Sequence, residues 1–389
     1  MSQPFFADRQ FHTPAFSLVL NGADLGQAVT RDVLEVSFTD ELEVISSFDF
    51  SLYDWDAEAL HPRYSSPWGP DGRPSPMGTG SGQTVPNFEP GARVDLHFGY
   101  VEEGALPLML RGEVVSLSPT FPASGVPTCR VRALEAFQRG LQKIHVEGNY
   151  TGTDKAIIAR LCADENIKVR FAALENEGKS HERVAIDGTL YDEIATRAKE
   201  YGLLMVTEPG DPPGLFLAAP TPAGAEPVAE LRWGVSLKEF TPVLSTAAAV
   251  AEVVVRRGDP EVPAADRQQD VIRRFSDIGL DPAAIGPAGV ADLQSAVRGI
   301  REVIKPDEVL SAEDAIKAAD AHLRELAGSL ITGNGSTVGL PELRAGALLR
   351  LSALGARFDG TYRITKAVHA IGGSGYTTTF AVRKEVLGA

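Results

Sequence analysis

The chain has 389 residues, of which 43% are hydrophobic and 23% are charged, and its formal net charge is −15. This length predicts two or three domains, and the negative charge excludes a nucleic acid or an anionic membrane surface as the main partner, because both bind basic faces. The longest apolar run, residues 246–255, is too short to span a membrane, and two cysteines, Cys129 and Cys162, do not make a disulfide framework.

The first part of the chain is predicted to be β. Strands are expected at 16–20, 33–38, 47–53, 93–100, 108–118 and 128–133. In the third of these, Phe48, Phe50 and Leu52 alternate with polar residues, which is typical of a half-buried strand. Residues 61–90 contain seven Pro and five Gly and are expected to form a long loop inserted into the β-domain.

The middle of the chain changes to helical spacing. We expect a helix capped by Thr153 or Asp154, a strand at 167–171 and a second helix that starts near Asp187-Gly188 and ends at Tyr201-Gly202. Strands at 203–207 and 215–218 follow. Together these elements predict a small α/β module.

The last part returns to β, with expected strands at 231–240 and 249–256. A partly helical insertion is predicted at 258–335, and its first part, 258–305, is punctuated by Pro and Gly. A helix capped by Ser311 follows and is expected to be closed by Gly333 and Gly335. Its expected apolar stripe consists of Ile316, Ala319, Leu323, Leu326, Ala327 and Leu330. The remaining residues, 340–386, are predicted to be β.

The last block of the chain repeats the first at an offset of about 250 residues. Segment 91–100 aligns with 345–354, the strand around Gly112 with the strand around Gly360, and 127–135 with 378–386. Two unrelated β-meanders would also look alike at this level, so both interpretations stay open. A true repeat predicts two related β-barrels with the α/β module between them.

The two ends of the chain carry opposite charge. Residues 1–60 hold eleven acidic and two basic residues, whereas residues 340–389 hold three acidic and seven basic residues. The two ends of the chain therefore carry opposite potentials.

No motif predicts catalysis, a cofactor or a metal site. Gly178-Lys179-Ser180 lacks the first glycine of a phosphate-binding loop, and His181-Glu182 lacks the second histidine of a zinc helix. A nucleophile elbow is missing, and the seven histidines have no metal-ligand spacing. The strand residues His97 and His369 are expected to be structural, and a binding or structural role is favoured over catalysis.

The C-terminal residues 309–384 resemble the phage late control D family. These are baseplate hub proteins of contractile tails, related to the hub part of VgrG spikes in contractile injection systems. The matching pieces are 343–346, 354–365, His369 and 375–378, and the segment 187–206 is similar to the family's α/β module. Residues 61–90 and 258–305 show no such similarity.

The resemblance implies a mainly β fold with α+β inserts, in which two related tail-hub barrels are separated by a small α/β module. The implied domains are 1–149, 150–225 and 226–389. It implies a homotrimer that links a spike protein to the inner tube or a tube initiator, contacts other baseplate proteins and starts tube assembly. Because VgrG-type spikes continue beyond the hub and this sequence ends at residue 389, a separate spike protein is expected. Such a protein would assemble in the bacterial cytoplasm and become part of a tail or injection particle.

The structural motif implied by the resemblance consists of Gly346, Gly355, Arg357, Phe358, Gly360 and Tyr362. Glycines are expected where strands turn tightly, and Phe358 and Tyr362 are expected to pack in the barrel. The candidate contacts between subunits are Arg350, Arg357 and Arg363. In a ring of subunits, the acidic first block is expected to meet the basic last block of a neighbouring subunit. A tail-associated peptidoglycan hydrolase and a monomeric two-barrel adaptor remain as alternatives.

Overall fold

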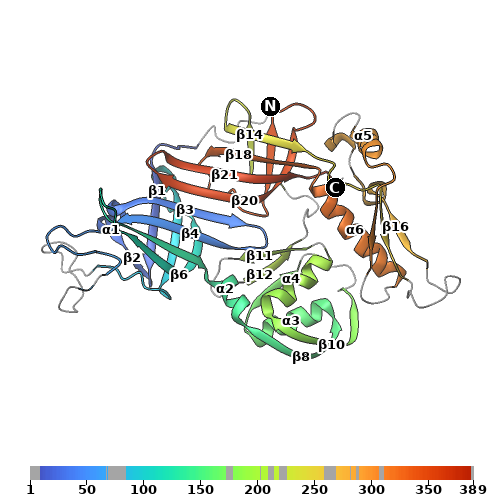
Figure 1. The fold of residues 1–389 in the computed structure, drawn as a ribbon, viewed down its shortest axis with the longest axis horizontal. Helices are drawn as coiled ribbons and strands as arrows, with labels where there is room; N and C mark the ends of the chain where they lie inside the picture. Colours follow the sequence, from blue (N-terminus) through green and yellow to red (C-terminus); the bar gives the residue numbers. More distant parts are fainter. Residues whose placement is uncertain are drawn as a thin grey trace. The chain divides into compact units, whose positions relative to one another are not determined.

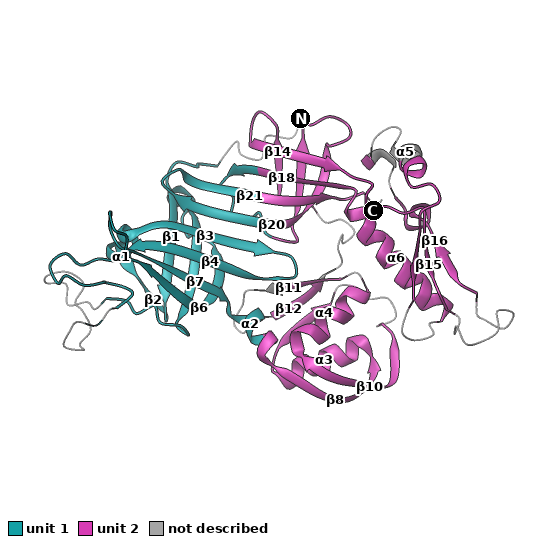
Figure 2. Cartoon of the chain, in the orientation of Figure 1, with its two compact units in different colours: residues 1–140, 336–344, 366–379 teal, residues 141–335, 345–365, 380–389 magenta. Residues whose placement is uncertain are grey.

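The computed structural model describes residues 9–66, 68, 85–171, 178–201, 203–208, 214–218, 226–257, 269–280, 282–285, 289–305 and 311–386 (Figure 1). The contacts divide the chain into two compact units (Figure 2). Unit 1 consists of residues 1–140, 336–344 and 366–379, and unit 2 of residues 141–335, 345–365 and 380–389. The three predicted domains remain a prediction beside this division.

Unit 1 is built mainly from the strands that the first part of the sequence predicts. Its N-terminal elements are β1 (Pro14–Leu20), β2 (Ala23–Asp24), α1 (Gly26–Asp32), β3 (Val33–Glu41), β4 (Val44–Tyr53), β5 (Arg93–Tyr100), η1 (Val101–Glu103), β6 (Leu108–Thr120), β7 (Thr128–Glu135) and the start of α2 (Ala136–Lys143). The predicted strands are confirmed, and most are a few residues longer than expected. Neighbouring strands in the path β3-β4-β7-β6-β5-β1 pair antiparallel.

The core of unit 1 follows from the alternation in β4. Phe48, Phe50 and Leu52 are at most 1% exposed, whereas the residues between them are half-buried. Phe50 packs edge-on against Phe88, with the ring centroids 5.2 Å apart. Burying side chains of this size stabilises the unit by roughly 1.5–3 kcal/mol each.

The first residues of the 61–90 loop are fixed by a buried carboxylate. Asp54, which is fully buried just after β4, accepts hydrogen bonds from the backbone amides of Tyr64 (2.6 Å) and Ser65 (3.0 Å). The Tyr64 hydroxyl donates to Asp32 at 2.6 Å. Residues 67 and 69–84 of this loop lie outside the described residues.

The α/β module in unit 2 contains two more strands than the sequence predicts. Its elements are β8 (His145–Thr153), α3 (Asp154–Asp164), β9 (Lys168–Phe171), β10 (Ser180–Thr189), α4 (Leu190–Glu200), β11 (Leu204–Glu208) and β12 (Gly214–Ala218). Thr153 caps α3, as predicted. The second helix starts at Leu190, close to the predicted Asp187-Gly188. Those two residues lie at the end of β10, which pairs with β8, and Thr189 is the cap. Gly202, the expected C-cap, lies outside the described residues.

The segment predicted as an insertion at 258–305 contributes strands to a sheet. After β13 (Ala229–Arg232) and β14 (Leu237–Leu244), unit 2 continues with β15 (Glu252–Val255), β16 (Val271–Arg273), η3 (Phe275–Ile278), η4 (Pro282–Ile285), α5 (Gly289–Ala296), β17 (Arg301–Ile304) and α6 (Ala312–Gly328). β15 pairs antiparallel with β16 and parallel with β17, and α6 packs on this sheet. The sequence predicted no strands in this segment, and the structure adds β16 and β17 there. The helical elements η3, η4, α5 and α6 agree with the partly helical character predicted for 258–335, and the interpretation as an insertion remains a prediction.

The buried face of α6 includes most of the predicted stripe, since Ala319, Leu323 and Ala327 are completely buried and Leu330 is 1% exposed. Ser311 caps the helix as expected, and its hydroxyl accepts from the amide of Asp314 at 3.1 Å. The residues that are completely buried are Ala315, Ala319, Leu323 and Ala327, at a spacing of four. Ile316, which the periodicity placed on the stripe, is 38% exposed, because the sheet contacts the narrower row of alanines instead.

The last strands are β18 (Ile331–Val338), β19 (Leu348–Ser352), β20 (Gly360–Gly372) and β21 (Gly375–Lys384). The prediction that Gly333 and Gly335 close the preceding helix is wrong, since both lie inside β18. A Cβ atom at Gly333 would approach the Phe240 ring to 2.6 Å, and one at Gly335 would approach the Phe380 ring to 2.7 Å. These glycines make room for aromatic rings on neighbouring strands.

The order of paired strands repeats where the sequence does. The path β3-β4-β7-β6-β5-β1 has the same form as β14-β18-β21-β20-β19-β13, and the segments aligned in sequence, β5-β6-β7 and β19-β20-β21, occupy equivalent places. The two paths differ at their ends, where β1 pairs antiparallel with β5 but β13 pairs parallel with β19. The fold is mainly β with α+β inserts, and a six-strand order occurs twice.

We predict that Gly339→Ala destabilises the protein by about 1–3 kcal/mol or more, because the new Cβ would lie 2.0 Å from the Tyr376 ring. The matched control is Gly373→Ala, where no atom lies within 4 Å and the backbone φ is not positive. Urea unfolding should show a lower midpoint for the first variant only. Equal midpoints for the two variants would contradict this packing.

Candidate functional site

The motif residues singled out from the sequence gather around the turn between β19 and β20 in unit 2. Gly346, Gly355 and Gly360 have φ values of 86°, 88° and 141°, which L side chains rarely adopt. In the turn, the amides of Phe358 and Asp359 donate to the carbonyl of Gly355 at 2.9 and 2.8 Å. These contacts give each glycine a conformational reason for its position.

Tyr362 anchors the turn to the interior of unit 2. Its ring is completely buried, lies edge-on to Phe240 at 5.8 Å, and its hydroxyl donates to the carbonyl of Phe358 at 2.7 Å. Burial raises the pKa of the Tyr362 hydroxyl, so it stays protonated and remains a donor. Phe358 itself is half-buried and contributes its carbonyl to this bond.

A buried arginine on β20, Arg363, links the residue Gly346 before β19 to Glu385 after β21. We call Gly346, Arg363 and Glu385 the arginine network. Arg363, which is 3% exposed, donates to Glu385 Oε1 and to the carbonyl of Gly346, both at 2.7 Å. Burial lowers the pKa of its guanidinium, and Glu385 opposes this change. A charge in this position is structural, because removing one partner would leave the other buried and unpaired.

The other two candidate contact residues are on the surface. Arg350 lies exposed in β19, and Arg357 lies exposed in the turn, where its carbonyl accepts a hydrogen bond from Lys384 Nζ at 2.8 Å. In the described part of the chain, neither guanidinium forms an ion pair. The structure therefore separates the predicted trio into one internal and two exposed arginines.

The remaining motif residues gather in unit 1 around His369, and we call Leu343, His369, Tyr376 and Thr378 the histidine network. His369 is completely buried on β20. Its Nε2 lies 2.9 Å from the carbonyl of Leu343, and its Nδ1 lies 3.0 Å from the Tyr376 hydroxyl and 3.1 Å from the Thr378 hydroxyl. Since a carbonyl only accepts, Nε2 carries the hydrogen and Nδ1 is the acceptor.

Burial keeps His369 neutral. It lowers the pKa of the imidazole to about 4, and the carbonyl of Leu343 opposes this effect only in part. The expectation that His369 is structural agrees with a ring that solvent does not reach and whose nitrogens are both occupied. His97, the other strand histidine, has a buried Nδ1 atom that forms no hydrogen bond with the residues that the structure describes.

Part of the attraction between the acidic first block and the basic last block is used inside unit 1. Arg344 donates to Asp40 at 2.6 Å, and Lys366 lies 2.8 Å from Glu41. Arg344 also lies over the ring of Phe38, 4.9 Å from its centroid. These contacts are within one chain, so the charge asymmetry does not by itself require a second subunit.

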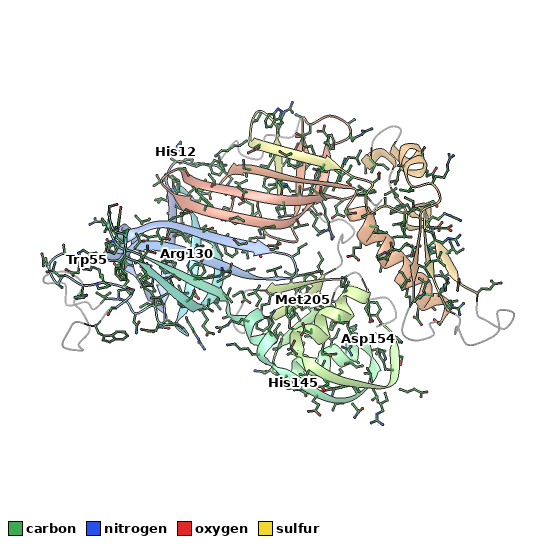
Figure 3. The ribbon with its side chains drawn as sticks, viewed as in Figure 1. His12, Trp55, Arg130, His145, Asp154 and Met205 are labelled. Atoms are coloured by element: carbon green, nitrogen blue, oxygen red, sulfur yellow. The ribbon has the colours of Figure 1, made fainter. Side chains whose placement is uncertain are left out.

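Sequence analysis missed a polar cluster in the α/β module. Asp154, which begins α3, is 1% exposed, and its carboxylate lies 2.8 Å from His181 Nε2 and accepts from the amide of Lys179 at 3.0 Å (Figure 3). The Tyr201 hydroxyl also donates to it. The cluster joins the start of α3, the start of β10 and the end of α4, which is information that local sequence patterns do not contain.

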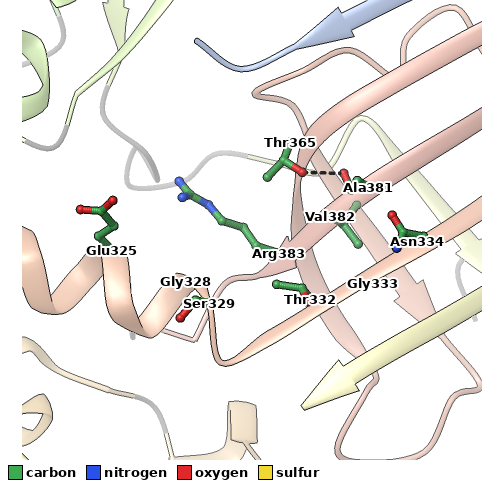
Figure 4. A pocket seen from close by; sticks show the side chains of 10 residues that line it. All are labelled: Glu325, Gly328, Ser329, Thr332, Gly333, Asn334, Thr365, Ala381, Val382 and Arg383. Carbon is green, nitrogen blue, oxygen red and sulfur yellow. Dashed lines mark hydrogen bonds between the residues drawn. The ribbon is translucent and has the colours of Figure 1, made fainter. Parts of the chain in front are cut away.

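A shallow pocket of about 420 Å³ lies in unit 2 beside the end of α6. Arg383 extends from β21 toward the end of α6, where Glu325 lies in the last helical turn and Ser329 is the C-cap (Figure 4). Thr365 donates to the carbonyl of Ala381 at 3.1 Å. The full lining consists of Glu325, Gly328, Ser329, Thr332, Gly333, Asn334, Thr365, Ala381, Val382 and Arg383. The Arg383 guanidinium lies near the C-terminus of α6, where a positive charge complements the helix dipole. The lining contains no histidine that could act as a base for the Ser329 hydroxyl, and no cysteine that could act as a nucleophile.

Within the described ranges, no three His, Cys, Asp or Glu side chains are arranged to hold a metal ion. Over the same ranges, the helices lack the length and apolar character needed to cross a membrane.

A family model described as the Alg8 N-terminal domain matches residues 81–373, well over half of the chain. The chain belongs to this family. The matching model is thus different from late control D, the family that the C-terminal motifs resemble. The matched range ends in the β20–β21 hairpin. It includes Gly346 and Arg363 of the arginine network and Leu343 and His369 of the histidine network, and it ends before Tyr376, Thr378 and Glu385. Among curated proteins, no sequence matches this member of the Alg8 N-terminal domain family.

Solved tail proteins share the fold of this family member over nearly its whole length. The 43 kDa tail protein of prophage MuSo2 from Shewanella oneidensis is 15% identical, with 96% of this chain and 98% of that chain covered and a TM-score of 0.67. The tail protein from Neisseria meningitidis MC58 is 12% identical, with 96% and 97% covered and a TM-score of 0.65. The E. coli protein c3393, described as a component of the type VI secretion system, is 10% identical, with 97% and 79% covered and a TM-score of 0.53. The chain therefore has a fold found in phage tail and type VI secretion proteins.

We predict that His369→Gln makes stability less dependent on pH between about 6.5 and 4. In this window the unfolded imidazole binds a proton and the folded one does not, so the free energy of unfolding of the wild type falls as the pH falls. The difference amounts to about 3 kcal/mol at the lower end. Glutamine keeps a donor for Leu343 and an acceptor for the hydroxyls, so the variant is expected to fold. Urea unfolding of both proteins across this window measures the effect, and parallel pH profiles would contradict a neutral buried His369.

Proposed function

We propose that the chain is a structural hub subunit of a contractile tail or injection-system baseplate. It forms a homotrimer that joins a spike protein to the inner tube or a tube initiator, contacts other baseplate proteins and starts tube assembly. The observation that carries this proposal is the near full-length similarity of the fold to two phage tail proteins. In this proposal the protein assembles in the bacterial cytoplasm and becomes part of the particle.

The repeated strand order supports the trimer. Each chain carries the six-strand order twice, so three chains present six copies of this strand repeat. A ring of six related units suits a tube of sixfold symmetry, while the true threefold axis suits a trimeric spike. A closed ring needs head-to-tail contacts that return to the first subunit. The proposal also includes that each of the two strand repeats forms a tail-hub barrel.

A non-enzymatic role is part of the proposal. In the histidine and arginine networks, the polar groups are buried, and each is hydrogen-bonded within its own network. This favours a role in supporting the fold over reaction with a substrate. The alternatives are a tail-associated peptidoglycan hydrolase and a monomeric two-barrel adaptor. Turnover of peptidoglycan by the purified chain would favour the hydrolase, and we expect none.

The trimer is tested by the mass of the purified protein in solution. We expect light scattering to give about 125 kDa, three times the 41.5 kDa of the chain, for the protein alone. If the trimer forms only with the spike protein encoded near it, the complex should contain three copies of the chain in addition to the mass of the spike. A protein that stays at 41.5 kDa with the spike present would contradict the hub and favour the adaptor.

We further propose that the exposed Arg350 and Arg357 contribute to the contact between subunits. Arg363 no longer belongs to this set, because it is 3% exposed and is bound to Glu385 and Gly346 within its own unit. Among the described residues, no acidic side chain pairs with Arg350 or Arg357, so their charges remain available for an acidic neighbour.

We predict that Arg350→Glu combined with Arg357→Glu weakens the trimer in a salt-dependent way, because reversed surface charges repel an acidic neighbour most strongly at low ionic strength. Light scattering over a range of salt and protein concentrations measures this. Arg363→Glu is the contrasting variant, and it should lower the stability of the single chain by about 3–5 kcal/mol by breaking a buried pair. Unchanged association of the double variant at low salt would overturn the contact.

A further inference from the structure

In the described part of the chain, the small sheet β16-β15-β17 packs on α6 through one face, and its other face carries exposed side chains. On the face that packs on α6, Arg273 of β16 donates to Asp320 of the helix at 2.7 and 3.0 Å. Successive side chains of a strand point to opposite faces. Residues one position from Arg273, namely Ile272 and Arg274, therefore belong to the face away from α6.

The register places an apolar row on the face away from α6. Val254 of β15 pairs with Ile272 of β16 on one side and with Val303 of β17 on the other. Ile272 is 45% exposed and Val303 is 39% exposed, while Val254 between them is 4% exposed. Side chains directly opposite on paired strands lie about 5 Å apart, so the three form an apolar row across the sheet, in which Ile272 and Val303 are exposed on either side of the buried Val254.

A charged row runs beside this apolar row on the same face. Glu252, two residues before Val254, forms ion pairs with Arg274 at 3.0 Å and with Arg301 at 2.5 Å. The two arginine side chains are 59% and 57% exposed, whereas the shared glutamate is 14% exposed. Two guanidinium groups thus share one carboxylate, which leaves a surplus positive charge on this face of a chain whose net charge is −15.

The spacing of the arginines defines the shape of a fitting partner. Arg301 lies on the strand that flanks β15 on one side, and Arg274 directly follows the strand on the other side, so their backbones are about 10 Å apart by the strand spacing. An α-helix with its side chains is about 10–12 Å wide. The apolar row and the charged row both run across the strands, so a helix laid along β15 would cross both rows. One of its flanks would lie over Ile272 and Arg274, and the other over Val303 and Arg301.

We propose that this face, formed by Ile272, Val254 and Val303 together with Arg274 and Arg301, binds an amphipathic helix of a partner protein that carries acidic residues on both sides of an apolar stripe. A second copy of this chain is a poorer occupant, because two such faces would bring four arginines against two glutamates. The proposal rests on this face alone and does not depend on the hub function.

The test measures binding of two synthetic amphipathic helices to the full chain by fluorescence anisotropy. Both peptides carry the same leucine stripe, flanked by glutamates in one and by lysines in the other. We expect the glutamate peptide to bind and the lysine peptide not to bind. Arg274→Glu with Arg301→Glu should weaken binding of the glutamate peptide by about tenfold or more, because charge-assisted contacts are lost. Ile272→Ser with Val303→Ser should weaken it as well.

Two further variants make the test specific. Glu252→Gln should strengthen binding of the glutamate peptide, because it removes the carboxylate that competes for both arginines, and a merely structural role of this trio predicts no gain. Arg350→Glu with Arg357→Glu reverses two exposed arginines elsewhere in unit 2 and should leave peptide binding unchanged, which separates this proposal from the trimer contact. Circular dichroism checks that every variant folds.

Three results would overturn the proposal. The first is that neither peptide binds, and the second is that both peptides bind equally, which would show an apolar surface without charge selection. The third is self-association of the wild type that Arg274→Glu with Arg301→Glu abolishes, since the face would then be a contact between copies of this chain.

Discussion

One strand, β20, carries hydrogen bonds and buried charges on which both units depend. Its first residues pair with β19 in unit 2, and its last residues, from Lys366 to Ile371, pair with β3 in unit 1. The same strand supplies Arg363 to the arginine network and His369 to the histidine network. Because a strand that carries two polar networks must satisfy every buried donor and acceptor, its register is strongly restricted.

The two networks satisfy buried polarity in different ways. The arginine network keeps a full charge inside unit 2 and compensates it with Glu385 and a carbonyl. The histidine network keeps its ring neutral, and so it has no charge to compensate at neutral pH. The arginine network loses stability when either partner is removed, and the histidine network loses stability in acid. The two units are therefore expected to unfold under different conditions.

Charge in this protein is divided between internal and external use. Asp40 and Glu41 of the acidic first block meet Arg344 and Lys366 of the basic last block within unit 1. In the part of the chain that the structure describes, the cations left without such a partner include Arg350 and Arg357, and the trio around Glu252 has one carboxylate for two arginines. These exposed cations carry the two contacts with acidic partners that we propose, because opposite charges attract across an interface.

The sequence by itself determined the strands of the first part of the chain and the starts of two capped helices, since their signals are local. Alternation marks β4, Thr153 and Ser311 mark the starts of α3 and α6, and the repeat between β5-β6-β7 and β19-β20-β21 reappears as a repeated strand order. Only the tertiary structure decided which polar residues are buried and which neighbours they meet. Arg350 and Arg363 look equivalent in sequence, but one is exposed and the other bound to Glu385; Gly333 looks like a helix end but lies under an aromatic ring; and the strands of 271–304 become a sheet only by pairing with β15. These outcomes depend on contacts between residues far apart in the chain, which local spacing cannot encode.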